Sequence, residues 1–341
     1  MKSGRKRWKR SRWLAPVLAA SFALLAAGCG DDDEKSLTVY SGREEEYVGP
    51  LFDRFMDETG VELDVRYGET AELAATLIEE GENSPADLFF AQDAGALGEL
   101  EKEGLFASLP DPPLSRVDGR YRSPEGVWVG TSGRARVVGY NTEKLSQSDL
   151  PPSILDFTDP RWKGKIGWAP TNGSFQAFVT AMRLTEGEEA TEEWLRGIVS
   201  NDPVVFDDNE AIRDAIASGE VEVGFLNHYY IAEAIAEEGE GYPVRGYHPP
   251  GDVGSLINVA GIGILESAGN RSEAEQFTDF VLGDESQRYF ADEVKEYPLV
   301  AAIPADPEVI PLAQIQQPDV RLGDLDDLDG TLKLLQRAGA L

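Results

Sequence analysis

Residues 36–67, "SLTVYSGREEEYVGPLFDRFMDETGVELDVRY", have the pattern of a strand, a helix and a second strand. The first strand ends at Gly42, and apolar residues then recur at helical spacing until Gly60 ends the helix. The alternation continues with a helix at 70–81, a strand at 86–92 and a helix at 94–106. This order predicts an α/β fold with a parallel, doubly wound sheet.

The chain has 341 residues, too many for one ordinary core, and therefore predicts two lobes. After a stretch rich in Pro and Gly at 107–130, further strand patterns alternate with helical ones, and the last helical pattern is "GTLKLLQRAG" (330–339). The long strands near 131–140 and 255–265 are predicted to cross between the lobes as hinges. The predicted segments are a first lobe at 37–130 plus 265–305, a second lobe at 131–264, and a tail with a helix at 306–341.

The first 28 residues predict an export signal. A basic start is followed by the apolar run 13–28, which is too short for a comfortable membrane span. The run ends at Cys29, the only cysteine, and "LLAAGC" (24–29) resembles the lipobox of bacterial lipoproteins. We therefore expect lipid on Cys29 and a polar tether at 29–36, anchoring the protein to the membrane without spanning it. A plain secretory signal is the alternative.

Acidic residues dominate the chain. All 62 Asp and Glu residues, but only 24 of the 31 Lys and Arg residues, lie after residue 28, so the mature protein has a net charge of −38. Phosphates would be repelled, which argues against nucleic acid as a partner. The charge suits a cationic ligand, although it also serves solubility.

Polar residues follow the predicted strands at four places. In open parallel sheets ligands bind at the carboxyl ends of the strands, which makes these residues candidates for a site. They are Gly42 to Glu45, Gln92 and Asp93, Thr171 to Ser174, and Asn227 to Tyr230. Asn209 opens another helix, where it also suits an N-cap.

The chemistry of these residues favours a hard cation with an anion. Carboxylates, phenols and amide oxygens are hard donors. A tyrosine ionises near neutral pH only beside strong positive charge, which a trivalent ion supplies. The segment "TNGSF" (171–175), at the opening of a helix, is a plausible anion nest.

Each residue also has a structural interpretation. Tyr229 and Tyr230 could pack in the core, and His228 could be structural or exposed. Glu44 and Glu45 could favour a helix N-terminus, and Ser174 could be a helix cap. Catalytic motifs such as G-x-S-x-G, H-E-x-x-H, C-x-x-C, the P-loop and G-x-G-x-x-G after the first strand are absent from the sequence. Nothing singles out a pair of carboxylates for hydrolysis among the 62 acidic residues.

The sequence resembles the ferric-iron-binding proteins of bacterial ABC importers, which are type II periplasmic binding proteins of transferrin-like architecture. The resemblance runs from Leu37 to the end. It is carried by "LTVYSGREEE", "SPADLFFAQDAGAL", "SGRARVVGYNT", "GKIGWAPTNGSF", "SGEVEVGFLNHYY" and "KEYPLV". The Asn-x-Tyr-Tyr segment at 227–230 is its most specific part.

The resemblance implies that Tyr229 and Tyr230 ligate a ferric ion. It implies a synergistic anion, phosphate or carbonate, held by Asn172, Gly173, Ser174, Asn209 and Asn227. In the first lobe the family usually has a histidine where Glu44 stands and a glutamate where Gln92 stands. Glu44 or the neighbouring Asp93 could replace those ligands, whereas Gln92 is a poorer one.

The implied protein is a monomer and not an enzyme. It captures iron between two lobes that close about the hinge strands, then delivers the ion to a membrane permease driven by a cytosolic ATPase. Two alternatives remain at this point. The same scaffold could bind a small organic solute, such as a phosphonate or a polyamine, or the chain could be an extracellular hydrolase with a pair of carboxylates.

Overall fold

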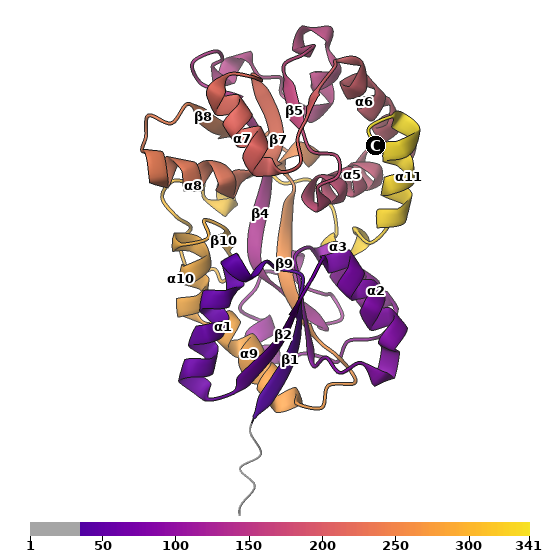
Figure 1. Ribbon diagram of the computed structural model, residues 1–341, viewed down its shortest axis with the longest axis vertical. Coiled ribbons are helices and arrows are strands. Elements are labelled where there is room, and N and C mark those ends of the chain that lie inside the picture. Colours follow the sequence, from indigo (N-terminus) through magenta and orange to yellow (C-terminus); the bar gives the residue numbers. More distant parts are fainter. Residues whose placement is uncertain (1–34) are drawn as a thin grey trace, which may run out of the picture. The chain divides into compact units, whose positions relative to one another are not determined.

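The computed structural model describes residues 35–341, so the predicted signal, Cys29 and most of the predicted tether lie outside the described residues. The first elements follow the predicted order (Figure 1). They are β1 (Ser36–Ser41), α1 (Glu45–Thr59), β2 (Glu62–Tyr67), α2 (Thr70–Glu80), β3 (Leu88–Ala91) and α3 (Ala94–Lys102). β1 pairs in parallel with both β2 and β3, as the alternation predicts. We call these elements the first lobe.

Helix α1 shows how the local pattern becomes structure. Its apolar positions Val48, Leu51, Phe52 and Phe55 are buried against the sheet, while its other face is exposed. Gly60 ends the helix with a left-handed backbone (φ 69°) that a residue with a Cβ rarely adopts. Because only three residues separate the end of β1 from the start of α1, the first turn of this packed helix lies at the carboxyl end of β1.

The second set of elements begins after the short helix α4 (Asp111–Leu114) and the long strand β4 (Trp128–Asn141). It consists of β5 (Ile166–Trp168), α5 (Gly173–Thr185), α6 (Glu188–Ser200), β6 (Val204–Val205), α7 (Asn209–Ser218), β7 (Val223–Asn227), α8 (His228–Glu238) and β8 (Val244–Tyr247). β5 pairs in parallel with β6 and β7. We call the elements from β5 to α8 the second lobe.

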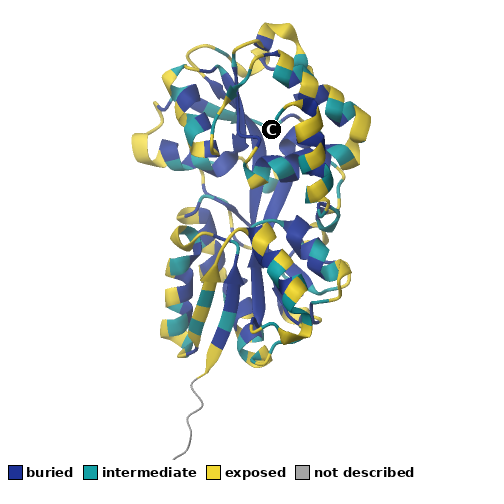
Figure 2. Cartoon of the chain, turned by 45° about the vertical axis from the view of Figure 1, so that its right-hand side comes forward, coloured by how far each residue is buried: buried dark blue, intermediate teal, exposed yellow. Residues whose placement is uncertain are grey.

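Two strands join the lobes, and both are the predicted crossings. All 14 residues of β4 are buried; its first half pairs with β9 (Ile257–Ile264), and its second half pairs with β7 and β8. β9 also pairs antiparallel with β3, giving the strand order β2-β1-β3-β9-β4-β7-β5-β6. The sheet is therefore parallel at its two ends and antiparallel where the strands cross, and burial is continuous along the crossing (Figure 2). The lobe boundaries remain a prediction.

The chain after β9 returns to the first lobe and then leaves it again. The helical pattern at 271–293 forms two helices, α9 (Arg271–Val281) and α10 (Asp284–Asp292), because Leu282 and Gly283 interrupt it. β10 (Tyr297–Pro298) pairs with β4, and α11 (Leu328–Ala338) packs against α5 and α6. Among residues 35–341, no helix is long and apolar enough to span a bilayer.

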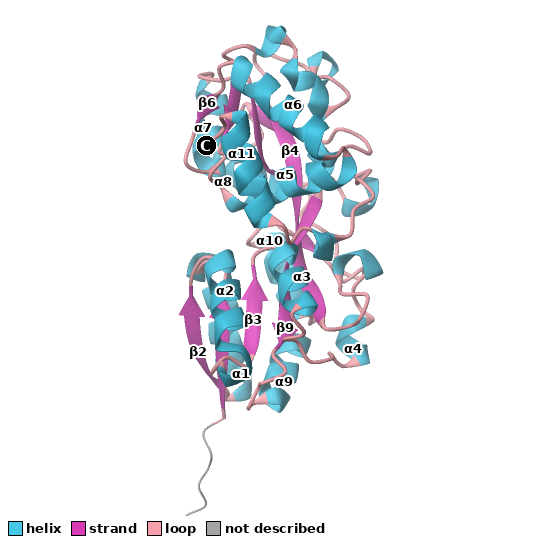
Figure 3. Cartoon of the chain, turned by 90° about the vertical axis from the view of Figure 1, so that its right-hand side faces the viewer, coloured by secondary structure: helices cyan, strands magenta, loops and turns pink. Residues whose placement is uncertain are grey.

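The tail crosses between the lobes beside α3, which makes a third connection (Figure 3). A Cβ on Gly98 would lie 1.9 Å from the carbonyl oxygen of Gly323, and one on Gly95 would lie 2.3 Å from that of Leu325. Lys102 pairs with Asp326 at 2.7 Å, and Arg183 of α5 pairs with the next residue, Asp327, at 2.7 Å. The tail is thus attached to α3 and to α5 through adjacent residues.

We predict that Gly98→Ala destabilises the fold. The added methyl would have to displace the tail backbone, at a cost of about 1–3 kcal/mol that exceeds the helix-propensity gain of alanine. Urea denaturation of the variant should show a lower midpoint. Gly241→Ala is the matched control, because a Cβ there meets nothing within 4 Å. Equal midpoints for the two variants would contradict the close packing of the tail on α3.

Candidate functional site

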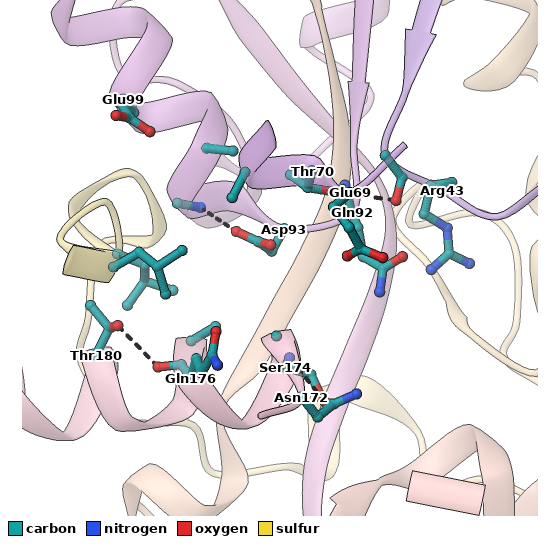
Figure 4. Close-up of a pocket in the computed structure, with 18 of the residues that line it drawn as sticks. Arg43, Glu69, Thr70, Gln92, Asp93, Glu99, Asn172, Ser174, Gln176 and Thr180 are labelled. Atoms are coloured by element: carbon teal, nitrogen blue, oxygen red, sulfur yellow. Dashed lines mark hydrogen bonds between the residues drawn. The ribbon is translucent and has the colours of Figure 1, made fainter. Parts of the chain in front are cut away.

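A cavity of about 550 Å³ lies at the carboxyl ends of β1, β2 and β3. Figure 4 shows Glu69, Gln92 and Asp93 of the first lobe on one side and Asn172 and Ser174 at the start of α5 on the other. The rule that ligands bind at strand carboxyl ends therefore selected the region in which this cavity lies.

Thr70, the first residue of α2, joins three of the strand-end loops. Its hydroxyl donates to the Gly42 carbonyl at 3.3 Å and accepts from the backbone N–H of Gln92 at 3.1 Å. A Cβ on Gly42 would lie only 2.1 Å from that hydroxyl, so glycine is required for this approach. The loops that carry Glu44 and Gln92 are held together as a result.

Glu44 and Gln92 form a hydrogen-bonded pair in this cavity. In the amide orientation that places the Gln92 nitrogen next to acceptors, Gln92 donates to Glu44 Oε2 at 2.9 Å and to the Gly42 carbonyl at 3.2 Å. Glu44 is exposed and occupies the N-cap position of α1, but its side chain makes no capping bond there. Asp93 differs, because its Oδ1 accepts from the Gly95 amide at 3.1 Å and so caps α3. Burial raises the pKa of Asp93, and the Arg134 charge opposes that shift.

Tyr229 and Tyr230 occupy the first turn of α8, directly after β7. Their rings stack with centroids 4.2 Å apart, and Tyr229 is 3% exposed. Tyr47 of α1 meets the Tyr229 ring edge-on at 6.3 Å, so a phenol of the first lobe joins the pair. The sequence pattern placed Tyr47 on the apolar face of a helix and did not reveal this contact.

The three phenols are neutral in this environment. Burial raises the pKa of Tyr229 well above its usual value, and the neighbouring Tyr230 raises it further. Burial also raises the pKa values of Tyr230 and Tyr47. Ionising them requires added positive charge, because desolvation penalises the phenolate.

Arg136 of β4 connects the predicted anion-binding residues. Its Nη1 donates to Ser174 Oγ at 3.2 Å, to Asn209 Oδ1 at 3.3 Å and to Asn227 Oδ1 at 3.1 Å. Asn172 caps α5, and its Oδ1 accepts from the Ser174 amide at 3.1 Å. Three polar residues, from the starts of α5 and α7 and from the end of β7, therefore bind one guanidinium, and Asn172 joins them through Ser174.

The predicted capping role of Asn209 was wrong. Asp208 is the N-cap of α7, since its carboxylate accepts from the Ala211 amide at 2.8 Å. Asn209 is the first helical residue, and its side chain is 2% exposed. The Asn209 side-chain amide therefore points inward, where its nitrogen donates to Asn172 Oδ1 at 3.2 Å. Ser174 likewise lies within α5 and is not its cap.

Three buried arginines, Arg43, Arg134 and Arg136, surround the tyrosine pair. Each is at most 4% exposed. Five of their nitrogens find no hydrogen-bond partner among residues 35–341: Arg43 Nε and Nη1, Arg134 Nε and Nη2, and Arg136 Nη2. Buried donors normally have partners, and burial lowers the pKa of Arg136 to about 9. The cluster therefore has unused capacity to bind an anion.

His228 has a structural role, as one interpretation of the sequence predicted. It is 6% exposed, and its Nδ1 accepts from the Ala135 amide of β4 at 3.1 Å. Burial lowers its pKa to about 3, so the ring is neutral near neutral pH. The ring stacks on Tyr297 at 4.4 Å and thereby fixes the start of α8.

Ten residues were predicted to bind the metal or the anion, and the structure gathers them in one region. Six of them line the cavity: Glu44, Gln92, Asp93, Asn172, Gly173 and Ser174. Asn209 and Asn227 do not line the cavity but are joined through Arg136 to Ser174, which does. Tyr229 and Tyr230 are not among the lining residues either, and Tyr229 is connected to Arg43 of the cavity wall through the Tyr47 ring. In the described part of the chain, no group of three or more His, Cys, Asp and Glu side chains could hold a metal ion by itself.

Residues 83–323 match the family model described as bacterial extracellular solute-binding protein. The chain belongs to this family. It is 31% identical over 333 residues to the Fe(3+)-binding periplasmic protein of Serratia marcescens, covering 96% of this chain and 98% of the relative. The predicted resemblance is thus confirmed, and a member of this solute-binding family is a transport protein rather than an enzyme.

Solved structures support the same family and the type II periplasmic binding protein fold. Iron-bound HitA of Pseudomonas aeruginosa is 32% identical, with a TM-score of 0.83 over 89% of this chain and 99% of HitA. The Trichodesmium protein IdiA (FutA), solved with iron and citrate, is 27% identical, with a TM-score of 0.77 over 89% of this chain and 99% of that one. The type II periplasmic binding protein fold that the resemblance implies is therefore confirmed.

We predict that Tyr229 and Tyr230 stay protonated at pH values where exposed tyrosines ionise. The pKa of each phenol is raised in the folded state relative to about 10 in the unfolded chain. Their contribution to stability is therefore fully present below about pH 10 and is lost as pH rises further, because only the unfolded state releases the protons. The phenolate absorbance of wild type minus that of a Tyr229→Phe/Tyr230→Phe variant should show no step near pH 10 before unfolding. A two-phenol step in the folded protein would contradict the burial of the pair.

Proposed function

We propose that this protein is an extracytoplasmic binding protein that captures ferric iron together with a synergistic anion. The observation that carries the proposal is the stacked pair of buried phenols, Tyr229 and Tyr230, near arginines whose donors lack partners within residues 35–341. The relatives named for iron binding support it.

The tyrosine pair accounts for selection of a trivalent ion. Two buried neutral phenols lose their protons only when the incoming charge outweighs the desolvation cost of both phenolates. A ferric ion provides three positive charges and prefers hard oxygen donors, whereas a divalent ion compensates the same cost less well. Binding should release about two protons per ion, because the ligating form of each phenol is the phenolate.

The anion completes the charge balance of the site. Arg43, Arg134 and Arg136 supply N–H donors that lack partners among the described residues. Asn172, Gly173, Ser174, Asn209 and Asn227 add amide and hydroxyl groups around Arg136. Phosphate or carbonate fits this donor set, since both are small oxyanions with several acceptor oxygens.

In the first lobe we propose Glu44 as the ligand. Its carboxylate lines the cavity and is not used as a helix cap, and Gln92 orients it through a hydrogen bond. Asp93 remains a candidate, but its Oδ1 caps α3. Gln92 is better suited to positioning Glu44 than to binding the ion, because a neutral amide is a weaker donor than a carboxylate.

Capture and delivery follow from the two-lobe arrangement. The second lobe would take the ion and the anion first, and closure about β4 and β9 would bring Glu44 to the ion. The closed monomer would dock on an ABC permease with its ATPase. Lipid on Cys29, after cleavage of residues 1–28, would hold it at the membrane. These steps are part of the proposal.

A second candidate function is binding of a small organic anion such as a phosphonate on the same scaffold. The five unpartnered arginine nitrogens favour it, because they would bind an organic phosphonate as well as an inorganic oxyanion. A polyamine is disfavoured by the same buried positive charge, and a carboxylate-pair hydrolase disagrees with the family.

We predict that the purified protein becomes red to orange with ferric citrate, since phenolate bound to ferric iron absorbs visible light. Tyr229→Phe together with Tyr230→Phe should abolish the band. The affinity for iron should fall by more than about a hundredfold, because two charged ligands are lost. Metal analysis of the protein measures the iron that remains bound. The matched control is Tyr140→Phe with Tyr247→Phe. It removes two phenols from β4 and β8 and should leave the colour unchanged.

The two candidate functions give opposite results in this experiment. Wild-type protein that stays colourless with ferric citrate, while binding a phosphonate in calorimetry, would overturn the iron proposal. Colour that survives in the Tyr229→Phe/Tyr230→Phe variant would show that other residues hold the ion.

A further inference from the structure

The cavity of the candidate site is larger than a ferric ion and an inorganic anion require. Its volume is about 550 Å³. A ferric ion with one phosphate takes the space of about six waters, or roughly 180 Å³. Cavities of about 300–1,000 Å³ usually hold organic molecules. Most of this cavity is therefore available to a ligand with an organic part.

The additional space lies between α3 and α5, and the tail closes it (Figure 4). Its lining side chains are mostly small or polar. They are Ala96 and Glu99 of α3, Gln176, Ala177 and Thr180 of α5, and Leu328 of the tail. On each helix these residues are three or four positions apart, so they share one face. None of them is among the residues proposed to bind the ion or its anion.

Arg134 provides positive charge at one end of the cavity. It lines the cavity and is 2% exposed, and its Nε and Nη2 find no hydrogen-bond partner within residues 35–341. The buried carboxylate of Glu296 lies 4.0 Å from Nε, but it accepts its hydrogen bond from Arg43, at 3.0 Å. Buried donors normally have partners, so Arg134 has the capacity to bind an oxyanion.

Glu99 provides negative charge at the other end. It is half-buried, and its neighbouring charges are the carboxylates of Asp326 and Glu103. Burial and these two carboxylates raise the pKa of Glu99, and no cation of the described chain opposes them. Lys102, which follows on α3, pairs with Asp326 instead, at 2.7 Å. A ligand that brings a positive charge would therefore stabilise the Glu99 carboxylate.

The other carboxylates that line the cavity are bound elsewhere or are exposed. Asp93 caps α3 through its Oδ1, and Asp326 is in the ion pair with the lysine. Glu44 and Glu69 are exposed to solvent. Glu99 is thus the carboxylate best placed to bind a cationic group within the cavity.

The contacts of Asn258 set the distance between the two charged ends. Asn258 lies opposite Arg134 in the pairing of β9 with β4, and its side chain accepts from the Ala94 N–H at 3.2 Å. The start of α3 is therefore beside Arg134. From there to Glu99 the helix rises by about 8 Å.

We propose that the protein takes the ferric ion as a chelate with a small zwitterionic molecule, whose oxyanion group binds at Arg134 and whose ammonium group binds at Glu99. The inference rests on the proposed function and names the anion of that site. A carboxylate of the chelator would take the place of phosphate or carbonate. Ala96 and Ala177 leave room for an apolar chain of about 8 Å that joins the two charged groups.

The test compares two chelators that share one iron-binding head. Nitrilotriacetate has no cationic group, whereas Nα,Nα-bis(carboxymethyl)lysine adds a butylammonium chain to the same head. We expect the ferric complex of the lysine derivative to bind the wild-type protein roughly tenfold more tightly in calorimetry, the effect of one hydrogen bond between charged groups. Its Nε-acetyl form has the same chain without the charge and should lose this preference.

Glu99→Gln should bind the two ferric complexes with equal affinity. Glu103→Gln is the matched control, because it removes the same charge from the end of α3 at an exposed residue that does not line the cavity. It should keep the tenfold preference. Because each variant is judged by the ratio of two affinities, a general change in stability does not imitate the effect.

Two results would overturn the inference. They are a preference that survives in Glu99→Gln, and wild-type protein that turns red with both complexes but binds them equally. The second result would leave the proposed function in place. Wild-type protein that stays colourless with both complexes would overturn the proposed function, and this inference with it.

Discussion

The burial of three guanidinium groups beside two phenols is the constraint on which the rest of the site depends. Arg134 and Arg136 lie on β4, every residue of which is buried, and Arg43 is attached to the same strand through Glu296 and Ser132. One buried carboxylate cannot balance three buried cations. A ligand that brings negative charge would therefore be favoured here, and the anion of the proposed ferric site would meet that condition.

Much of this arrangement follows from local sequence. The strand-to-helix pattern at 36–106 predicts parallel strands, and Glu44 and Gln92 occur at the carboxyl ends of two of them. Asn172 likewise follows β5. Tyr229 and Tyr230 could be predicted because a strand pattern changes to a helical pattern directly before them. All of these residues can be identified from the local pattern of strand and helix alone, and the fold then brings them to one region.

The arginines and Glu296 were not predicted, for a physical reason. The strand "SGRARVVGY" was interpreted as a hinge, although Arg134 and Arg136 are two residues apart and so point to the same face of a strand. That spacing was the available signal. Glu296 had none, because 253 residues separate it from Arg43, and only the three-dimensional fold joins them. The short strands β8 and β10 and the break between α9 and α10 were also missed, since two to four residues carry little periodicity.

The position of β9 has a consequence for how the protein forms. β9 pairs with β3 on one side and with β4 on the other, although the chain builds the whole second lobe between β4 and β9. The edge of β3 therefore stays unpaired until residues 257–264 are available, and an unpaired edge is a template for association with other chains. Folding must wait for contacts between distant parts of the chain, which are slow to form. No continuous fragment that ends before β9 can complete the sheet of the first lobe, so this lobe finishes forming only after the second lobe has been synthesised.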